Sequence, residues 1–302
     1  MSTALPRDVI DQLASFGPDI TPDLREGSWA LLTPFHEKAG YTAPRVERDL
    51  AYGPHERHRL DVHAGIGTSD PSPVVLFAHG GGFVAGDKHV PGTPMYDHVG
   101  AWAVRHGWTG VTMTYRLAPG HTWPAGAEDV AAAVAWTREH IAAYGGDPDR
   151  IVVAGHSAGA VHVASFIAGQ GGGSTAGVRG ATLLSGVYDL SGPGETPGRG
   201  ETPDRGELEK AYFGDLPGQT VSSLPWLLDT EIPLLFSVAE HDPALFHAQA
   251  AGVVAAWLAR HGTVPALAYA QGHNHISEIA SLGIDDDALG IALARFIARH
   301  TS

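Results

Sequence analysis

The chain has 302 residues, of which 43% are hydrophobic and 17% are charged, as in a globular protein with a sizeable core. Its 33 acidic residues outnumber its 19 basic ones, and the formal net charge of −14 disfavours binding to nucleic acid or to an anionic membrane surface. Cysteine is absent, which excludes disulfides, thiolate catalysis and cysteine-based zinc sites.

The sequence also indicates where the protein acts. Residues 1–8 lack the basic segment and apolar core of a secretory signal, and no apolar run approaches the roughly 20 residues that cross a bilayer. We therefore expect a cytoplasmic protein with a small-molecule substrate and with no nucleic-acid or membrane partner.

The N-terminal part differs in pattern from the rest. Apolar residues recur at approximate helical spacing over residues 1–45, with prolines as breaks, which predicts amphipathic helices. From Val46 to Val62 polar and apolar residues alternate, which predicts a pair of strands at the edge of a sheet.

Beyond residue 73, apolar runs of strand length alternate with helical stretches. Such runs indicate strands buried on both faces, as in a parallel sheet covered by helices. The predicted strands are residues 74–78, 110–115, 151–154, 181–184, 234–238 and 266–270. With helices predicted over residues 128–144 and 245–261, the pattern indicates a doubly wound, mostly parallel α/β sheet.

One segment interrupts this alternation. Residues 191–220 are rich in Gly, Pro, Asp and Glu, and they are too numerous for an ordinary connection. A segment of this length is usually a functional lid or a disordered stretch. We expect it to belong to an insert at about residues 186–228 in a catalytic domain of residues 46–302.

The sequence Gly155-His156-Ser157-Ala158-Gly159 directly follows the strand predicted at residues 151–154. It has the G-x-S-x-G pattern in the strand–turn–helix context that a serine nucleophile requires. The glycines permit a tight turn that projects the hydroxyl clear of the sheet. The N–H groups of the following helix also point toward any negative charge that develops there. Ser157 is therefore the predicted nucleophile.

A glycine run, His79-Gly80-Gly81-Gly82-Phe83, follows the strand predicted at residues 74–78. Acyl transfer needs preorganised donors for its oxyanion, and backbone N–H groups serve where glycines allow close approach. Gly81, Gly82 and Ala158 are the predicted donors. The run also fits the loose G-x-G-x-x-A pattern of dinucleotide loops, but no acidic residue ends the next strand to hold a ribose.

A serine nucleophile needs a base and an orienting carboxylate, which in this order of elements follow the serine. Asp242 and His275 lie at the ends of the last two predicted strands and are the predicted pair, with Glu240 and His273 as alternates. A metal site built from His241, Asp242, His273 and His275 is a rival reading. It leaves the serine motif and the glycine run without a purpose, so we predict no metal and no cofactor.

These motifs resemble the α/β-hydrolase superfamily, and within it the hormone-sensitive-lipase-like carboxylesterases. The resemblance runs from about Val74 to the C-terminus; besides the segments above it includes Tyr115-Arg116-Leu117-Ala118-Pro119, Gly146-Asp147-Pro148 and Asp242-Pro243. It implies an α/β-hydrolase fold, with residues 1–45 and about 186–228 as cap elements. The Gly155–Ala160 stretch is more similar to the kynurenine-formamidase and feruloyl-esterase-like branch. Related esterases are often dimers, which implies a homodimer as one assembly.

The predicted function is a carboxylic ester hydrolase that acts on small esters through an acyl-enzyme. Two alternatives stay open: the same triad acting on a C–N bond, as in an arylformamidase, amidase or carbamate hydrolase, and a non-catalytic binder on a hydrolase scaffold. Phe83, His156 and Trp226 are predicted to contact substrate. The aromatic candidates for the acyl pocket, each equally suited to core packing, are Trp29, Phe35, Phe83, Trp226 and Phe246.

Overall fold

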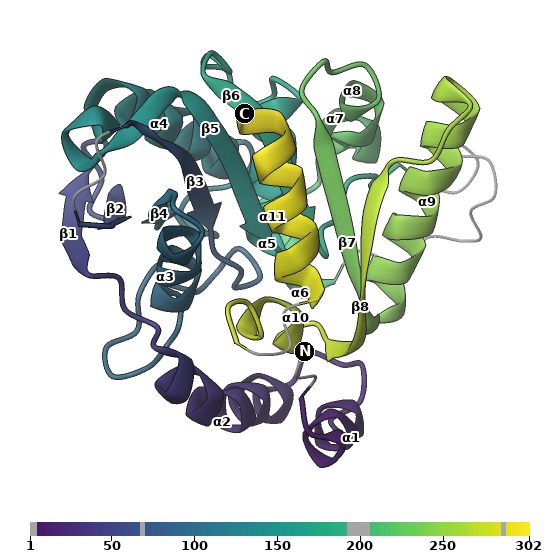
Figure 1. Ribbon diagram of the computed structural model, residues 1–302. Coiled ribbons are helices and arrows are strands. Elements are labelled where there is room, and N and C mark those ends of the chain that lie inside the picture. The colour runs from purple at the N-terminus through teal and green to yellow at the C-terminus, as the bar shows by residue number, and fades with distance from the viewer. Residues whose placement is uncertain (1–4, 67–69, 192–205, 285–287) are drawn as a thin grey trace.

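A computed structural model describes residues 5–66, 70–191, 206–284 and 288–302. In these residues the chain forms one eight-stranded sheet with helices on both faces (Figure 1). The strand order is β1-β2-β4-β3-β5-β6-β7-β8. β1 pairs with β2 and β2 with β4 in antiparallel fashion, and all other neighbours are parallel. The predicted doubly wound, mostly parallel sheet with an antiparallel edge pair is confirmed.

The strands match the apolar runs of the sequence and extend most of them. Their bounds are β1 Arg45–Ala51, β2 Arg59–Ala64, β3 Ser72–Ala78, β4 Thr109–Met113, β5 Gly146–His156, β6 Val178–Leu184, β7 Leu234–His241 and β8 Ala266–Asn274. The buried runs on the middle strands, such as Val74–Ala78, have almost no exposed surface because helices cover both of their faces.

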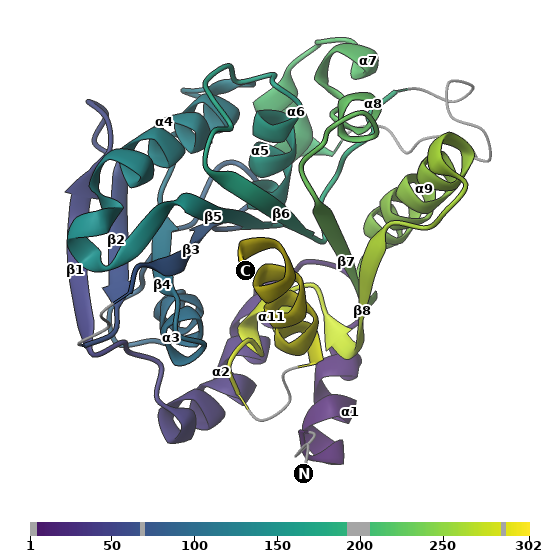
Figure 2. The same ribbon diagram turned by 45° about the horizontal axis from the view of Figure 1, so that its top comes forward.

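Two groups of helices cover the two faces of the sheet (Figure 2). On one face lie α4 (Ala125–His140), η1 (Ile141–Tyr144), α5 (Ala158–Ile167), α8 (Leu224–Leu227) and α9 (Ala244–His261). On the other lie α3 (Asp97–Arg105), α10 (Ser277–Ala280) and α11 (Ala288–Thr301). Each group packs apolar side chains on its own face of the strands, which makes two separate core layers.

The N-terminal segment forms two helices, α1 (Arg7–Ser15) and α2 (Pro22–Ala39), across the end of the sheet where β8 terminates (Figure 1). The Thr21 hydroxyl caps α2 by accepting the Leu24 N–H at 3.1 Å. The fully buried Asn274 ties this segment to the end of β8, because its Nδ2 donates to the Leu13 carbonyl at 3.1 Å and to Ser28 Oγ at 3.0 Å. Helices thus form at Arg7–Ser15 and Pro22–Ala39 within the segment predicted to be helical, while the role of this segment as a cap stays a prediction.

The predicted insert at about residues 186–228 lies only partly in the described ranges. Residues 192–205, which hold most of the glycines and prolines of the 191–220 stretch, fall outside them. The described part forms α6 (Glu207–Phe213), α7 (Gly218–Val221) and α8. Tyr212 and Phe213 of α6 are buried against Phe83, whose ring stacks on that of Tyr212 at a centroid distance of 4.5 Å. The insert therefore packs directly on the glycine-rich loop after β3.

A network of buried charges ties that loop to the antiparallel edge of the sheet. Arg48 of β1 contacts Asp61 of β2 at 2.7 Å and Asp97 of α3 at 2.6 Å. The Lys88 ammonium, in the loop after β3, lies 2.7 Å from Asp49 and 3.0 Å from Asp61. Burial alone would lower the pKa of Lys88, but the two carboxylates outweigh it and raise that pKa. The lysine therefore stays charged.

We predict that Asp61→Asn strongly destabilises the protein. Asp61 is fully buried and forms ion pairs with both Arg48 and Lys88. Removing one partner from a buried ion pair typically costs about 3–5 kcal/mol. The measurement is the free energy of unfolding in urea. Asp11→Asn is the control, because it breaks an exposed Arg7–Asp11 pair that should contribute less than about 1 kcal/mol. Equal effects of the two substitutions would contradict the role given to the network.

Candidate active site

Ser157 lies on the sharp turn between β5 and α5. Its backbone adopts φ 55° and ψ −121°, a left-handed conformation that a non-glycine residue rarely takes. The Ser157 N–H donates to the Leu184 carbonyl at 2.8 Å, which fixes the turn against β6. This is the strained strand–turn–helix geometry on which hydrolases expose a nucleophilic serine.

The glycines of the motif permit helix α5 to approach the sheet closely. A Cβ on Gly159 would lie 2.1 Å from the Ala78 carbonyl oxygen, and one on Gly155 would lie 2.4 Å from the Gly159 carbonyl oxygen. Both neighbours are backbone atoms, which cannot move aside as a flexible side chain can. Glycine is therefore required at both positions if the hydroxyl is to stay where it is.

The glycine-rich loop after β3 runs beside the serine. Gly81 adopts φ 139° and Gly82 φ 58°, and a Cβ on Gly81 would lie 2.0 Å from the Ala85 carbonyl oxygen. Within the described part of the chain, neither glycine N–H has a hydrogen-bond acceptor. Ala158 begins α5, so its N–H has no partner in the helix. The structure thus brings all three predicted donors to the cavity that Ser157 borders.

Asp242 and His275 meet in a buried hydrogen bond. The His275 Nδ1–H donates to Asp242 Oδ1 at 2.6 Å, and the other carboxylate oxygen accepts the Ala239 N–H at 2.7 Å. Burial alone would raise the pKa of Asp242, but the hydrogen bonds and the nearby imidazole outweigh it and hold that pKa below its ordinary value. Asp242 is therefore ionised, and His275 presents Nε2 as an acceptor.

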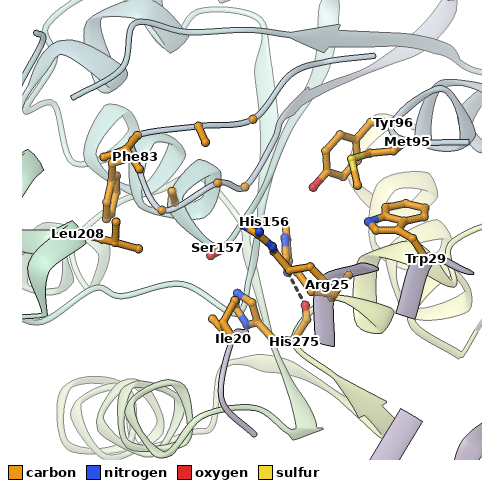
Figure 3. Close-up of a pocket in the computed structure, with 18 of the residues that line it drawn as sticks. Ile20, Arg25, Trp29, Phe83, Met95, Tyr96, His156, Ser157, Leu208 and His275 are labelled. Atoms are coloured by element: carbon orange, nitrogen blue, oxygen red, sulfur yellow. Dashed lines mark hydrogen bonds between the residues drawn. The ribbon is translucent and has the colours of Figure 1, made fainter. Parts of the chain in front are cut away.

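Ser157 and His275 both border one cavity, but no hydrogen bond joins them in the described coordinates. His275 Nε2 is buried and has no partner there, so nothing competes for its lone pair. Figure 3 shows the two side chains entering the cavity from different elements. Catalytic hydrogen bonds are often long or misaligned without substrate and tighten in the complex, so this geometry leaves His275 available as the base.

The alternates from the sequence have other contacts. Glu240 accepts the Gly272 N–H at 2.6 Å, and His273 Nδ1 lies 3.1 Å from Ser277 Oγ. Neither is among the described residues that line the cavity. The rival metal cluster is not assembled either, because the described residues contain no group of three or more His, Asp or Glu side chains placed to hold an ion.

His156 immediately precedes the serine and packs against the predicted base, with 4.8 Å between the ring centroids of His156 and His275. Its Nε2–H donates to the His275 carbonyl at 2.8 Å, the dashed bond in Figure 3. Burial and the neighbouring His275 lower the pKa of His156 to about 3, so the ring is neutral. His156 borders the cavity as predicted for a substrate contact, but the structure also gives it the task of holding the backbone of His275.

The cavity has a volume of about 670 Å³ and is walled mainly by apolar side chains. Trp29, Phe83 and Phe246 line it, and the Phe246 ring lies 4.4 Å from that of His275. Phe35 packs instead in the cluster between α1, α2 and α10, and Trp226 is 58% exposed and is not among the described lining residues. The structure therefore does not bring Trp226 to the site.

Several lining residues were not predicted from the sequence. From α2 and the loops they are Ile20, Arg25, Glu26, Thr33, Met95 and Tyr96, and from α6 they are Leu208 and Glu209. Figure 3 shows Arg25 and Trp29 facing the site from the N-terminal segment and Leu208 facing it from the insert. No short motif marks such residues, because their place depends on how α2 and α6 pack over the sheet.

A family model and several known proteins are similar to parts of this chain. A family model described as BD-FAE matches residues 60–193. The esterase LipQ of Mycobacterium tuberculosis is 31% identical over 223 residues, which are 69% of this chain and 52% of LipQ. The carboxylesterase NlhH of the same organism is 48% identical over 92 residues, 30% of this chain and 27% of NlhH. The chain thus spans about half of LipQ and about a quarter of NlhH.

Solved structures match over nearly the whole chain. A bacterial heroin esterase superposes with a TM-score of 0.70 at 22% identity, over 98% of each chain. An esterase from Pyrobaculum calidifontis does so with a TM-score of 0.67 at 23% identity, again over 98% of each. The chain has the α/β-hydrolase fold. The predicted fold is confirmed, and LipQ, NlhH and the two esterase structures bear out the predicted resemblance to carboxylesterases. None of the helices in its described ranges combines the length and the hydropathy that crossing a membrane demands.

We predict that Gly159→Ala disrupts the candidate site. The new Cβ forces α5 away from the Ala78 carbonyl, so we expect a lower midpoint of thermal unfolding and loss of labelling of Ser157 by a fluorophosphonate. Gly252→Ala is the matched control, since Gly252 lies in α9 with open space around its Cα. That control should be as stable as the wild type or more so, because alanine favours a helix over glycine by about 0.5–1 kcal/mol. Wild-type labelling of the Gly159 variant would refute the steric argument.

Proposed function

We propose that this α/β-hydrolase hydrolyses carboxylic esters through an acyl-enzyme, with Ser157 as nucleophile, His275 as base and Asp242 as orienting carboxylate. The observation that carries the proposal is the 2.6 Å hydrogen bond from His275 Nδ1 to Asp242, at the border of a cavity that Ser157 also borders. A buried, oriented imidazole beside a serine on a strained turn has the parts of a nucleophilic triad.

The steps follow from the positions of the protons. His275 Nε2 accepts the Ser157 hydroxyl proton as Oγ attacks the ester carbonyl, and ionised Asp242 stabilises the imidazolium that forms. The tetrahedral intermediate expels the alcohol, which takes the proton from His275. Water then loses a proton to His275 as it attacks the acyl-enzyme, and the acid leaves when Ser157 regains its hydrogen.

The developing oxyanion needs donors that are already in place. The N–H groups of Gly81, Gly82 and Ala158 border the cavity, and the two glycine N–H groups have no acceptor in the described residues. A preorganised donor of this kind contributes about 3–4 kcal/mol of transition-state stabilisation. The positive end of the α5 dipole adds to it.

The cavity supports a small, mainly apolar ester as substrate. Its volume of about 670 Å³ and its aromatic walls suit a compact acyl or alcohol group better than a long polymer. The names of LipQ and NlhH, an esterase and a carboxylesterase, favour the same class. We further propose that the protein acts in the cytoplasm, and that it forms a homodimer if it assembles as related esterases do.

We predict that Ser157→Ala abolishes both hydrolysis of p-nitrophenyl acetate and covalent labelling by a fluorophosphonate. Without Oγ there is no atom to form the acyl bond, so activity should fall by roughly 10⁶-fold. Intact-protein mass spectrometry of the wild type should show one adduct, located at Ser157 by peptide mapping. An adduct on another residue, or none, would overturn the assigned nucleophile.

We also predict that Asp242→Asn lowers kcat by about 10³–10⁴-fold while the fold is retained. An amide at position 242 cannot stabilise the imidazolium and can favour the wrong imidazole tautomer. His140→Gln, on the exposed side of α4, is the control and should leave kcat unchanged. If both variants keep wild-type kcat, His275 has another orienting partner and the triad is wrong.

The bond that is cleaved can be tested directly. We predict higher kcat/KM for p-nitrophenyl esters of short acids than for N-formyl-kynurenine, and a decline with acyl length as the chain fills the cavity. A preference for the formamide would assign the same triad to a C–N bond instead.

A further inference from the structure

A second carboxyl group lies directly behind the Asp242–His275 pair. Glu278 is on α10, three residues after His275, and its side chain is fully buried. Its Oε2 lies 2.5 Å from Ser185 Oγ, and its Oε1 lies 2.5 Å from Ser237 Oγ. Ser185 Oγ in turn lies 2.7 Å from Asp242 Oδ2. One serine hydroxyl therefore bridges the two carboxyl groups.

The three contacts that join Ser185 and Ser237 to the two carboxyl groups need three protons, and the two serine hydroxyls supply only two. A hydroxyl carries a single proton, so Ser185 donates to only one of its two carboxyl partners. Oxygen atoms 2.5–2.7 Å apart are held by a proton between them, and two bare oxygens at that distance would repel each other. The second contact of Ser185 therefore requires a proton on Asp242 or on Glu278.

The surroundings decide which carboxyl carries it. Asp242 accepts from His275 Nδ1 and from the Ala239 N–H, and its other contact is Ser185, so its charge is stabilised. Glu278 receives only neutral hydroxyl groups, and burial and the nearby Asp242 raise its pKa to about 8. The proton thus belongs to Glu278: its Oε2–H donates to Ser185, and the Ser185 hydroxyl donates to Asp242.

Among the described residues, the groups that face Glu278 place no charged cation against it. His156 Nε2 is 4.0 Å from Glu278 Oε2 but donates to the His275 carbonyl, and its ring is neutral. Tyr188, after β6, keeps its proton because burial raises its pKa. From α2 and α3, His36 and His98 bond the carbonyls of the next two residues of α10, and burial lowers the pKa of both rings. On β8, His273 contacts Ser277.

We propose that Glu278 is a positioning residue which, in its protonated form, supplies through Ser185 the hydrogen bond that holds Asp242 facing His275. The proposal rests on the triad proposed above. Glu278 touches no substrate; it acts on the orientation of Asp242. When Glu278 loses its proton to water, the Ser185 hydroxyl is drawn to the new carboxylate, and Asp242 loses a donor and gains a repelling neighbour.

The test compares Glu278→Gln with Glu278→Leu. Glutamine keeps the shape, donates from Nε2 to Ser185 and accepts from Ser237, but it cannot ionise. Kinetics with p-nitrophenyl acetate should give near wild-type kcat for Glu278→Gln at pH 7. Leucine lacks the donor, so kcat should fall about ten- to hundredfold with little change in KM, the loss expected for one hydrogen bond to a charged group.

The pH profile gives a readout that a purely structural role would not move. Wild-type kcat should decline above about pH 8, as Glu278 ionises, and Glu278→Gln should lack this decline. The free energy of unfolding of the wild type should also decrease as the pH rises. A carboxyl whose pKa is higher in the folded protein than in the unfolded chain loses folding free energy as pH rises, from its ordinary range near 4.5 up to about 8. The midpoint of thermal unfolding should follow that slope in the wild type and not in Glu278→Gln.

Infrared difference spectroscopy observes the proton without using activity. At pH 7 the wild type should show the C=O band of a protonated carboxyl that is missing from Glu278→Gln. If no such band is lost, or if both proteins share the alkaline decline, the proposal is overturned. A wild type that neither hydrolyses esters nor labels with a fluorophosphonate would overturn the proposed function instead, while the band still reports on Glu278.

Discussion

The 2.6 Å hydrogen bond between Asp242 and His275 organises the site more than any other contact. It joins the loop after β7 to the loop after β8, and it sets which nitrogen of the imidazole faces the cavity. Because both side chains are buried, the ionised carboxylate needs donors around it: the Ala239 N–H and the Ser185 hydroxyl donate to Asp242, and Glu278 lies behind Ser185. These contacts stabilise a negative charge that burial would otherwise make costly.

The parts of the site that could be predicted from the sequence are those fixed by local chemistry. Two motifs can be recognised in the sequence: Ser157 with its flanking glycines, and the glycine run after β3. In both, a Cβ would lie 2.0–2.4 Å from backbone atoms, so only glycine fits. The strands were equally readable, because burial on both faces demands continuous apolar runs. Asp242 and His275 followed from order along the chain: the carboxyl ends of parallel strands meet at one edge.

What could not be predicted depends on packing between distant segments. Arg25 and Leu208 reach the cavity because α2 and α6 pack over it. The resemblance implied cap elements in both regions, but no motif marks which of their residues face the cavity. Trp226 has an aromatic ring in the predicted insert, yet α8 turns it to solvent. Glu278 was overlooked for a different reason. A glutamate shortly after the proposed base His275 has the sequence pattern of an exposed residue at the start of a helix, and only its contacts with Ser185 and Ser237 show that it is buried behind Asp242.

The arrangement of α2 over the cavity separates two tasks in the chain. Every group proposed to break the bond belongs to a loop after a strand or to the start of α5, whereas Arg25, Glu26, Trp29 and Thr33 come from a single helix near the N-terminus. The side-chain amide of Asn274 holds the N-terminal segment against the sheet. The residues of α2 that line the cavity can therefore change while this attachment is kept. Selectivity can thus diverge among descendants of such a protein through exchange of one amphipathic helix, with the reactive machinery inherited unaltered.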